Sequence, residues 1–245
     1  MARELFSVCR GCPGVALTIV WEILLRNPAA AQYRESPEYQ LSEARFISAG
    51  FFICDFRPST SNTLDDSLAI RYDQLMPVIG FHQGIVDVVA GYTRYRQEGM
   101  NREAVLLSAT MSPELPLTGG REEALLLPVM LSSNFGKAET RGPQRETFNI
   151  ASLGIGVGLK FRSCGPSHDG WVSLVGLVHY SFEGFGIGSG FSPALIGEAA
   201  VLLPDVVWSI PLALGYRFRL QSWEMSEEKF NYRSVSHGPY MGVVF

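Results

Sequence analysis

The chain has 245 residues, of which 18% are charged and 47% are hydrophobic, and its formal net charge is −4. This length suits one large all-β domain, and the charged fraction is below the quarter or so that is usual in soluble domains. A mild negative charge without a long basic run excludes nucleic acid as an expected partner. Because no stretch of about 18 or more uncharged apolar residues occurs, the sequence predicts no transmembrane helix.

The first 31 residues have the layout of an export signal. Arg3 and Arg10 supply positive charge, Gly14–Leu25 forms a short apolar core, and Ala29–Ala31 offers small residues for cleavage. The alternative is a short amphipathic helix that stays in the mature protein. We expect a signal peptide over 1–31, and no Cys stands at the cleavage point to carry a lipid anchor.

After a polar periplasmic arm over 32–42, about ten segments have the character of strands. The clearest is 152–162, in which Leu, Ile, Val and Phe alternate with Ser, Gly, Lys and Arg. The next is 208–221, whose apolar stripe from Trp208 to Phe218 has about the length of a membrane-spanning strand. The opposite face carries small residues and a few charges, which is typical of a narrow wet lumen, whereas a soluble core uses large branched side chains.

The other strand-like segments are less regular. Stretches 45–57, 68–82 and 85–97 are apolar on both faces in places, whereas 105–112 and 125–132 alternate. In a membrane barrel the connections alternate between short turns on one side and longer loops on the other. The shorter ones are expected near 82–84, 113–121, 163–169 and 204–205, and the longer ones over 58–67, 97–102, 136–146, 183–193 and 222–229.

The last eight residues, 238–245, form the most informative strand. Met241, Val243 and Phe245 fall on one face, because successive side chains of a strand alternate. An apolar strand with an unpaired edge invites aggregation, unless that edge pairs with the first strand and closes a barrel. The alternative is a plain edge strand that ends in Phe.

A terminal strand with these alternating apolar residues and a C-terminal Phe resembles the assembly signal of Gram-negative outer-membrane β-barrels. The resemblance implies an all-β, antiparallel up-and-down transmembrane barrel over 43–245, with about ten strands in a range of about 8 to 12. It also implies localisation in the outer membrane, recognition by the barrel-assembly machinery, and contact with outer-membrane lipids and lipopolysaccharide.

Neither the cysteines nor the glycine-rich stretch predicts a cofactor or a metal. Cys9 and Cys12 form a C-x-x-C within the expected signal peptide, without the second pair that a zinc site needs. Cys54 and Cys164 are either free thiols or one disulfide. Gly184–Gly190 imitates a dinucleotide fingerprint, but it does not stand between a strand and a helix, so we interpret it as a surface loop.

A group of charged residues is expected to face the lumen. Its members are Lys160, Arg162, Glu198, Arg217 and Arg219. Unpaired charges in a narrow barrel are costly, so pairing between arginine and glutamate is expected. One interpretation is a selectivity or gating cluster. The other, which we favour because a barrel of about ten strands has a small interior, is a structural network that fills the barrel.

The sequence also contains a possible hydrolase motif. His179-Tyr180-Ser181 is similar to the H-x-S motif of lipid A 3-O-deacylases, which are outer-membrane barrels with a His–Ser–acid triad. The resemblance implies His179 as base, Ser181 as nucleophile, and Glu183 or Glu198 as acid. Alternation turns His179 and Ser181 inward, whereas the family places its triad toward the lipid.

These features favour a non-enzymatic outer-membrane barrel, either structural or a porin-like narrow solute pore. The first alternative is a lipid A-modifying outer-membrane hydrolase that uses His179 and Ser181. The second is a soluble, lipocalin-like barrel that binds an apolar ligand, and it requires the large apolar side chains to point inward.

Overall fold

A computed structural model describes residues 45–59, 71–97, 99–120, 122–141, 147–165, 168–183, 189–207, 210–226 and 231–245. The expected signal peptide over 1–31, the arm over 32–42, and Cys9 and Cys12 lie outside these residues. Within them, no helix has the length and apolarity that a membrane span requires.

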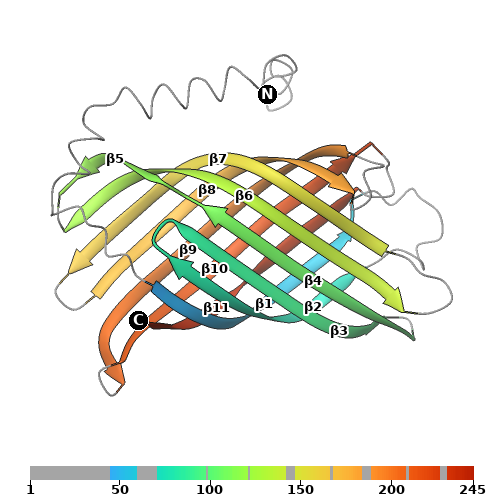
Figure 1. Ribbon diagram of the computed structural model, residues 1–245, viewed down its shortest axis with the longest axis horizontal. Helices are drawn as coiled ribbons and strands as arrows, with labels where there is room; N and C mark the ends of the chain where they lie inside the picture. Colours follow the sequence, from blue (N-terminus) through green and yellow to red (C-terminus); the bar gives the residue numbers. More distant parts are fainter. Residues whose placement is uncertain are drawn as a thin grey trace, which may run out of the picture. The chain divides into compact units, whose positions relative to one another are not determined.

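The described part of the chain forms eleven strands in one antiparallel sheet (Figure 1). The strands are β1 (Arg45–Pro58), β2 (Tyr72–Gln83), β3 (Val86–Gln97), β4 (Met100–Met111), β5 (Glu114–Gly119), β6 (Glu123–Arg141), β7 (Thr147–Gly165), β8 (His168–Glu183), β9 (Ser189–Val207), β10 (Ile210–Met225) and β11 (Tyr232–Val244). Apart from β4 and β5, which do not pair with each other, each strand pairs with its neighbour in sequence, and β1 also pairs with β11. The sheet closes on itself because β4 pairs with β6.

Strands β4 and β5 share one position in the barrel wall. Both pair with β6, with Met111 opposite Leu131 and Glu114 opposite Pro128, so β5 continues the line of β4. Pro113 interrupts the line because it has no backbone N–H, and its carbonyl accepts a 2.9 Å hydrogen bond from the Val129 amide. The described chain is therefore a closed barrel of ten strand positions, which confirms the expected fold and strand number.

Several expected connections were wrong. Residues 113–121 were expected to form a connection, but Glu114–Gly119 within them forms β5. β5 contains Pro116, which lacks the backbone N–H that a strand residue donates to its ladder. The expected turn at 204–205 lies inside β9, which extends to Val207. The longer loops are also shorter than expected, because β6 reaches Arg141 and β9 begins at Ser189.

The C-terminal strand closes the barrel as expected. Phe46 lies opposite Val244 in the β1–β11 ladder, and the Phe245 amide donates a 2.9 Å hydrogen bond to the Arg45 carbonyl. Met241, Val243 and Phe245 are 58%, 51% and 66% exposed, so all three face outward. We call this end, where β1 begins and β11 ends, the turn end, and the opposite end the loop end.

Large apolar side chains cover the outer surface of the barrel. They occupy alternate positions along the strands, and among the most exposed are Ile47, Phe51, Leu75, Ile79, Leu153, Val172, Phe191 and Met241. Soluble proteins rarely expose contiguous apolar patches beyond a few hundred Å². This outward arrangement is the opposite of what the soluble, lipocalin-like alternative requires.

The inner face of β7 is built from glycines that make room for β8. A Cβ at Gly156 would stand 2.7 Å from the Leu177 side chain, and one at Gly158 would stand 2.8 Å from the Val175 side chain. Both distances are far inside van der Waals contact. The small residues on this face therefore allow large side chains from the next strand to lie across the narrow interior.

We predict that Gly156→Val destabilises the barrel by about 1–3 kcal/mol, because it overpacks the interior against Leu177. Gly176→Val is the matched control, since nothing lies within 4 Å of a Cβ at Gly176 and that face points outward. The measurement is urea unfolding in lipid vesicles, followed by tryptophan fluorescence. Equal midpoints for the two variants would contradict the packing argument.

Candidate functional site

An ion-pair bridge crosses the interior of the barrel. Arg217 on β10 contacts Glu198 on β9 through Nη2 and Oε1 at 2.8 Å. It also contacts Asp87 on β3, with Nη1–Oδ2 at 2.9 Å and Nη2–Oδ1 at 3.2 Å. Strands β3 and β10 are not neighbours in the sheet, so the contact between Arg217 and Asp87 spans the lumen.

Aromatic and imidazole groups complete this bridge. Tyr240 donates a 2.6 Å hydrogen bond to Glu198 Oε1, and Trp171 Nε1 donates one of 3.4 Å to Oε2. His82 Nδ1 lies 3.6 Å from Asp87 Oδ1. Glu198 thus has two donors besides Arg217, which offset part of the cost of burying its charge. We call His82, Asp87, Trp171, Glu198, Arg217 and Tyr240 the central cluster.

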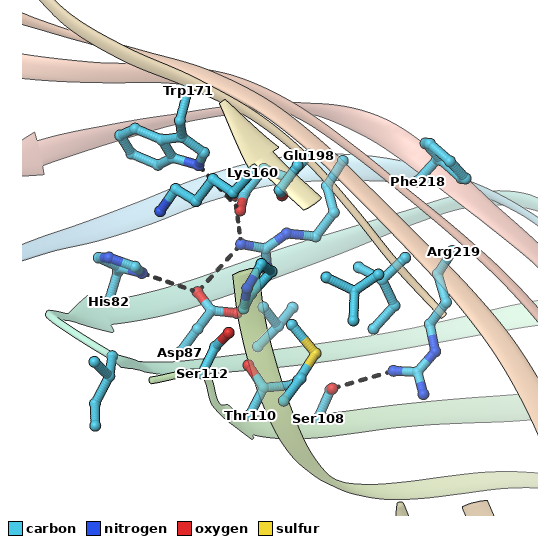
Figure 2. A pocket seen from close by; sticks show the side chains of 18 of the residues that line it. His82, Asp87, Ser108, Thr110, Ser112, Lys160, Trp171, Glu198, Phe218 and Arg219 are labelled. Atoms are coloured by element: carbon cyan, nitrogen blue, oxygen red, sulfur yellow. Dashed lines mark hydrogen bonds and ion pairs between the residues drawn. The ribbon is translucent and has the colours of Figure 1, made fainter. Parts of the chain in front are cut away.

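Figure 2 shows Asp87 and Glu198 pointing toward the same part of the interior, with Arg219 apart from them. A cavity of about 100 Å³ lies beside this cluster. Its lining mixes apolar side chains with six charged ones, which are Asp87, Glu114, Lys160, Glu198, Arg217 and Arg219. A space of this size holds water, because one molecule needs about 10–15 Å³.

The structure brings only part of the expected charge group together. Lys160 pairs with Glu114 of β5 at 2.7 Å, and its ammonium lies 5.0 Å from the centre of the Trp171 ring. Arg162 pairs with Asp169 of β8, with Nε–Oδ1 at 3.1 Å. Both residues therefore bind carboxylates of their own, and Lys160 does so while lying against Trp171 of the central cluster.

The acidic partners were missed by the sequence interpretation. Asp87 lies in a segment that is apolar on both faces, so its inward position was not resolved. Glu114 was assigned to a loop, and Asp169 lies at the start of a strand. Alternation along 85–97 was the one available signal for Asp87, because Asp87 and Val89 share a face.

A second group, closer to the loop end, is polar but carries no carboxylate. Arg219 Nη1 donates to Asn134 Oδ1 at 2.6 Å and to Ser108 Oγ at 3.2 Å. Asn134 Nδ2 lies 2.9 Å from His179 Nε2, and Gln221 donates to Ser192 at 2.7 Å. We call Ser108, Asn134, His179, Ser192, Arg219 and Gln221 the polar layer.

The geometry of His179 and Ser181 differs from that of a hydrolytic pair. Both side chains are fully buried, at 0% exposure, on the inner face of β8. His179 uses Nε2 for Asn134 and Nδ1 for the Ser192 carbonyl, at 2.9 and 3.2 Å. The Ser181 hydroxyl has no hydrogen-bond partner among the described residues. A nucleophile and its base need a mutual hydrogen bond, and these two residues do not make one.

The described cysteines do not pair. Cys54 is buried inside the barrel, Cys164 is half-buried, and both are free thiols. Within the described ranges, no three His, Cys, Asp or Glu side chains come close enough together to hold a metal ion.

No protein-family model and no curated protein matches the chain. Among solved structures, it is similar to the outer membrane protease OmpT from Escherichia coli, with 8% identity, a TM-score of 0.38, and 85% of this chain and 100% of that chain covered. It is also similar to the transport unit of the autotransporter AIDA-I from Escherichia coli, with 10% identity, a TM-score of 0.33, and 89% of this chain and 97% of that chain covered. For the outer membrane protein OprG from Pseudomonas aeruginosa the values are 12% identity, a TM-score of 0.30, and coverage of 82% and 93%.

Likenesses at these identities and TM-scores carry no conclusion about activity. The wall itself is informative, since its outer surface is apolar, its interior holds the buried charged and polar groups between apolar clusters, and its strands close antiparallel in a ring. This architecture is that of the outer-membrane β-barrels.

Proposed function

We propose that the protein is a Gram-negative outer-membrane β-barrel that catalyses no reaction and whose lumen is closed to the free diffusion of ions. The observation that carries the proposal is the contact of Arg217 with Asp87 across the lumen. A conducting pore needs a continuous wet path, and the interior of a barrel this narrow is filled where side chains from opposite walls meet.

The outer surface supports a location in a bilayer. Exposed aromatic side chains lie toward both ends of the wall, with Phe81 and Phe161 near the turn end and Tyr180 and Phe191 near the loop end. Aromatic side chains at both interfaces, with aliphatic ones between them, are typical of membrane barrels. Membrane lipids and lipopolysaccharide are the partners that such a surface would contact, and the barrel-assembly machinery would receive the C-terminal strand.

The arrangement of His179 and Ser181 supports a role without catalysis. Their side chains lie in a closed interior rather than toward lipid, and His179 is held by Asn134 and Ser192. Glu198, one of the two acids proposed from sequence, is bound by Arg217 and Tyr240. Ser181→Ala should therefore leave lipid A acylation unchanged.

Planar-bilayer recording tests whether the central cluster closes the lumen. We expect no stable conductance from the wild-type protein and a measurable one from the double variant Asp87→Ala/Arg217→Ala, because the bridge is then absent. The double variant avoids leaving Asp87 as an unpaired buried charge, and Glu198, which loses Arg217, keeps its hydrogen bonds from Tyr240 and Trp171. The control is Asp55→Ala/Arg57→Ala, which removes an exposed ion pair. A steady conductance from the wild type, or silence from the Asp87/Arg217 variant, would contradict the proposal.

Deletion of Phe245 tests the assembly role of the C-terminal strand. We expect a several-fold loss of protein from the outer-membrane fraction, since Phe245 ends the strand that closes the ring and its amide bonds to Arg45. Gly120→Ala is a turn control, because nothing lies within 4 Å of a Cβ there. Recovery of the wild-type protein in the soluble periplasm would refute the membrane location, and equal yields for both variants would refute the assembly role.

A further inference from the structure

A second cavity, of about 80 Å³, lies inside the barrel toward the loop end. The aromatic residues Phe56, Phe148 and Trp223 bound the cavity on the side of the loop end. Its opposite side, which we call the floor, includes Asn134, Arg219 and Gln221. The side walls are mostly apolar. The cavity thus has an apolar body and a polar floor, the composition expected of a small-molecule site.

The aromatic boundary is rigid. The ring centroids of Phe56 and Phe148 are 4.8 Å apart with an interplanar angle of 68°. Trp223 packs edge-on against both, at 6.0 Å from Phe56 and 5.7 Å from Phe148. Edge-to-face contacts at these distances are favourable, so the three rings form a preformed apolar surface rather than a loose filling.

The floor holds a buried cation that lacks a counter-ion. Arg219 makes no ion pair within the described chain, and its Nε and Nη2 atoms are inaccessible to solvent and have no hydrogen-bond partner there. Only Nη1 is bound, by the neutral groups of Asn134 and Ser108. Burying a charged donor without partners is costly. Two residues earlier on the same face, Arg217 has two carboxylates.

The two unpartnered nitrogens of Arg219 lie on one edge of its guanidinium group. Nε and Nη2 point their N–H groups in parallel, and this fork matches the two oxygens of a carboxylate. Asn134 fixes the opposite side through Nη1 and so orients the free edge. Because the surrounding walls are apolar, an inorganic anion would satisfy the fork but leave most of the cavity unmatched.

We propose that this cavity binds a small amphipathic carboxylate, with its two oxygens on Nε and Nη2 of Arg219 and its hydrocarbon chain against Phe56, Phe148 and Trp223. Because these two nitrogens have almost no accessible surface, the side chains packed against that edge of Arg219 must shift as the carboxylate enters. The proposal goes beyond the proposed function and needs only a folded barrel. Binding at Arg219 does not depend on whether the central cluster blocks ions. A result that refutes carboxylate binding therefore leaves the proposed function intact, and the reverse also holds.

The backbone ladder between β2 and β3 has a break beside this cavity. Strands β2 and β3 pair only over Val78–Gln83 and Val86–Gly91, so the described ladder ends before their loop-end halves. Side chains close the gap, with Tyr72 edge-on to Tyr95 at 4.8 Å. Tyr72 also lines the cavity, as does Met76, which is buried on the same strand. An amphipathic carboxylate partitions into lipid, so the same molecule would reach this break laterally.

The experiment uses 8-bromooctanoate as the probe and the purified full-length protein in detergent micelles. Because bromine quenches indole at short range and Trp223 lines the cavity, we expect saturable quenching that Trp223→Phe removes. Unlabelled octanoate should compete. Arg219→Gln should weaken binding by about tenfold to a hundredfold, the effect of losing hydrogen bonds to a charged group. Arg57→Gln, which changes an exposed arginine, should bind as the wild type does.

Competition by other probes separates the alternatives. Octan-1-ol has the chain without the carboxylate and phosphate has the charge without the chain, so both should compete at least tenfold less well than octanoate. Equal competition by either one, or unchanged affinity in Arg219→Gln, overturns the proposal.

Urea unfolding without ligand gives a second readout. Arg219→Gln should be at least as stable as the wild type, because it removes an uncompensated buried charge. A lower midpoint, together with unchanged binding, would instead make Arg219 a structural residue.

Discussion

Closure of the ring by hydrogen bonds between β1 and β11 is the constraint on which the rest of this molecule depends. In lipid, an unpaired backbone N–H or C=O has no water to bind, so a sheet can span a membrane only without edges. Once Phe46 lies opposite Val244, the ring is closed, and of the eleven described strands only the short β5 has a single paired neighbour. The outward apolar residues and the inward position of the charged groups both follow from the alternation of side chains along each strand.

A ring of ten positions leaves little room inside, and this limit selects the residues of the inner face. Glycines of β7 lie beneath Leu177 and Val175, while charged side chains reach across the remaining space. Charges in so narrow an interior must find partners on whichever wall is opposite. Arg217 therefore binds Asp87, which lies 130 residues away in the chain.

The difference between alternation along one strand and contacts across the lumen explains what the sequence could and could not predict. Alternation is local, so residues 152–162 and the terminal Met241, Val243 and Phe245 were sufficient to predict the faces and the closure. Partners across the lumen are set by the curvature of the ring, which no spacing in the sequence encodes. Glu114 was missed for another reason, because it lies within 113–121, which was expected to be a connection. The structure instead pairs this stretch with β6 despite Pro116.

Arg217 and Arg219 show why a common face does not imply a common role. Both project inward from β10 two residues apart, and sequence analysis placed them in one group. Arg217 pairs with carboxylates from two strands, Asp87 of β3 and Glu198 of β9, as expected of a structural side chain that fills the lumen. Arg219 meets only neutral oxygens and keeps two buried N–H groups unbound beside an apolar cavity. A purely structural position would gain stability from an apolar or neutral residue, so the charge there is better explained by an anion that arrives from outside the chain.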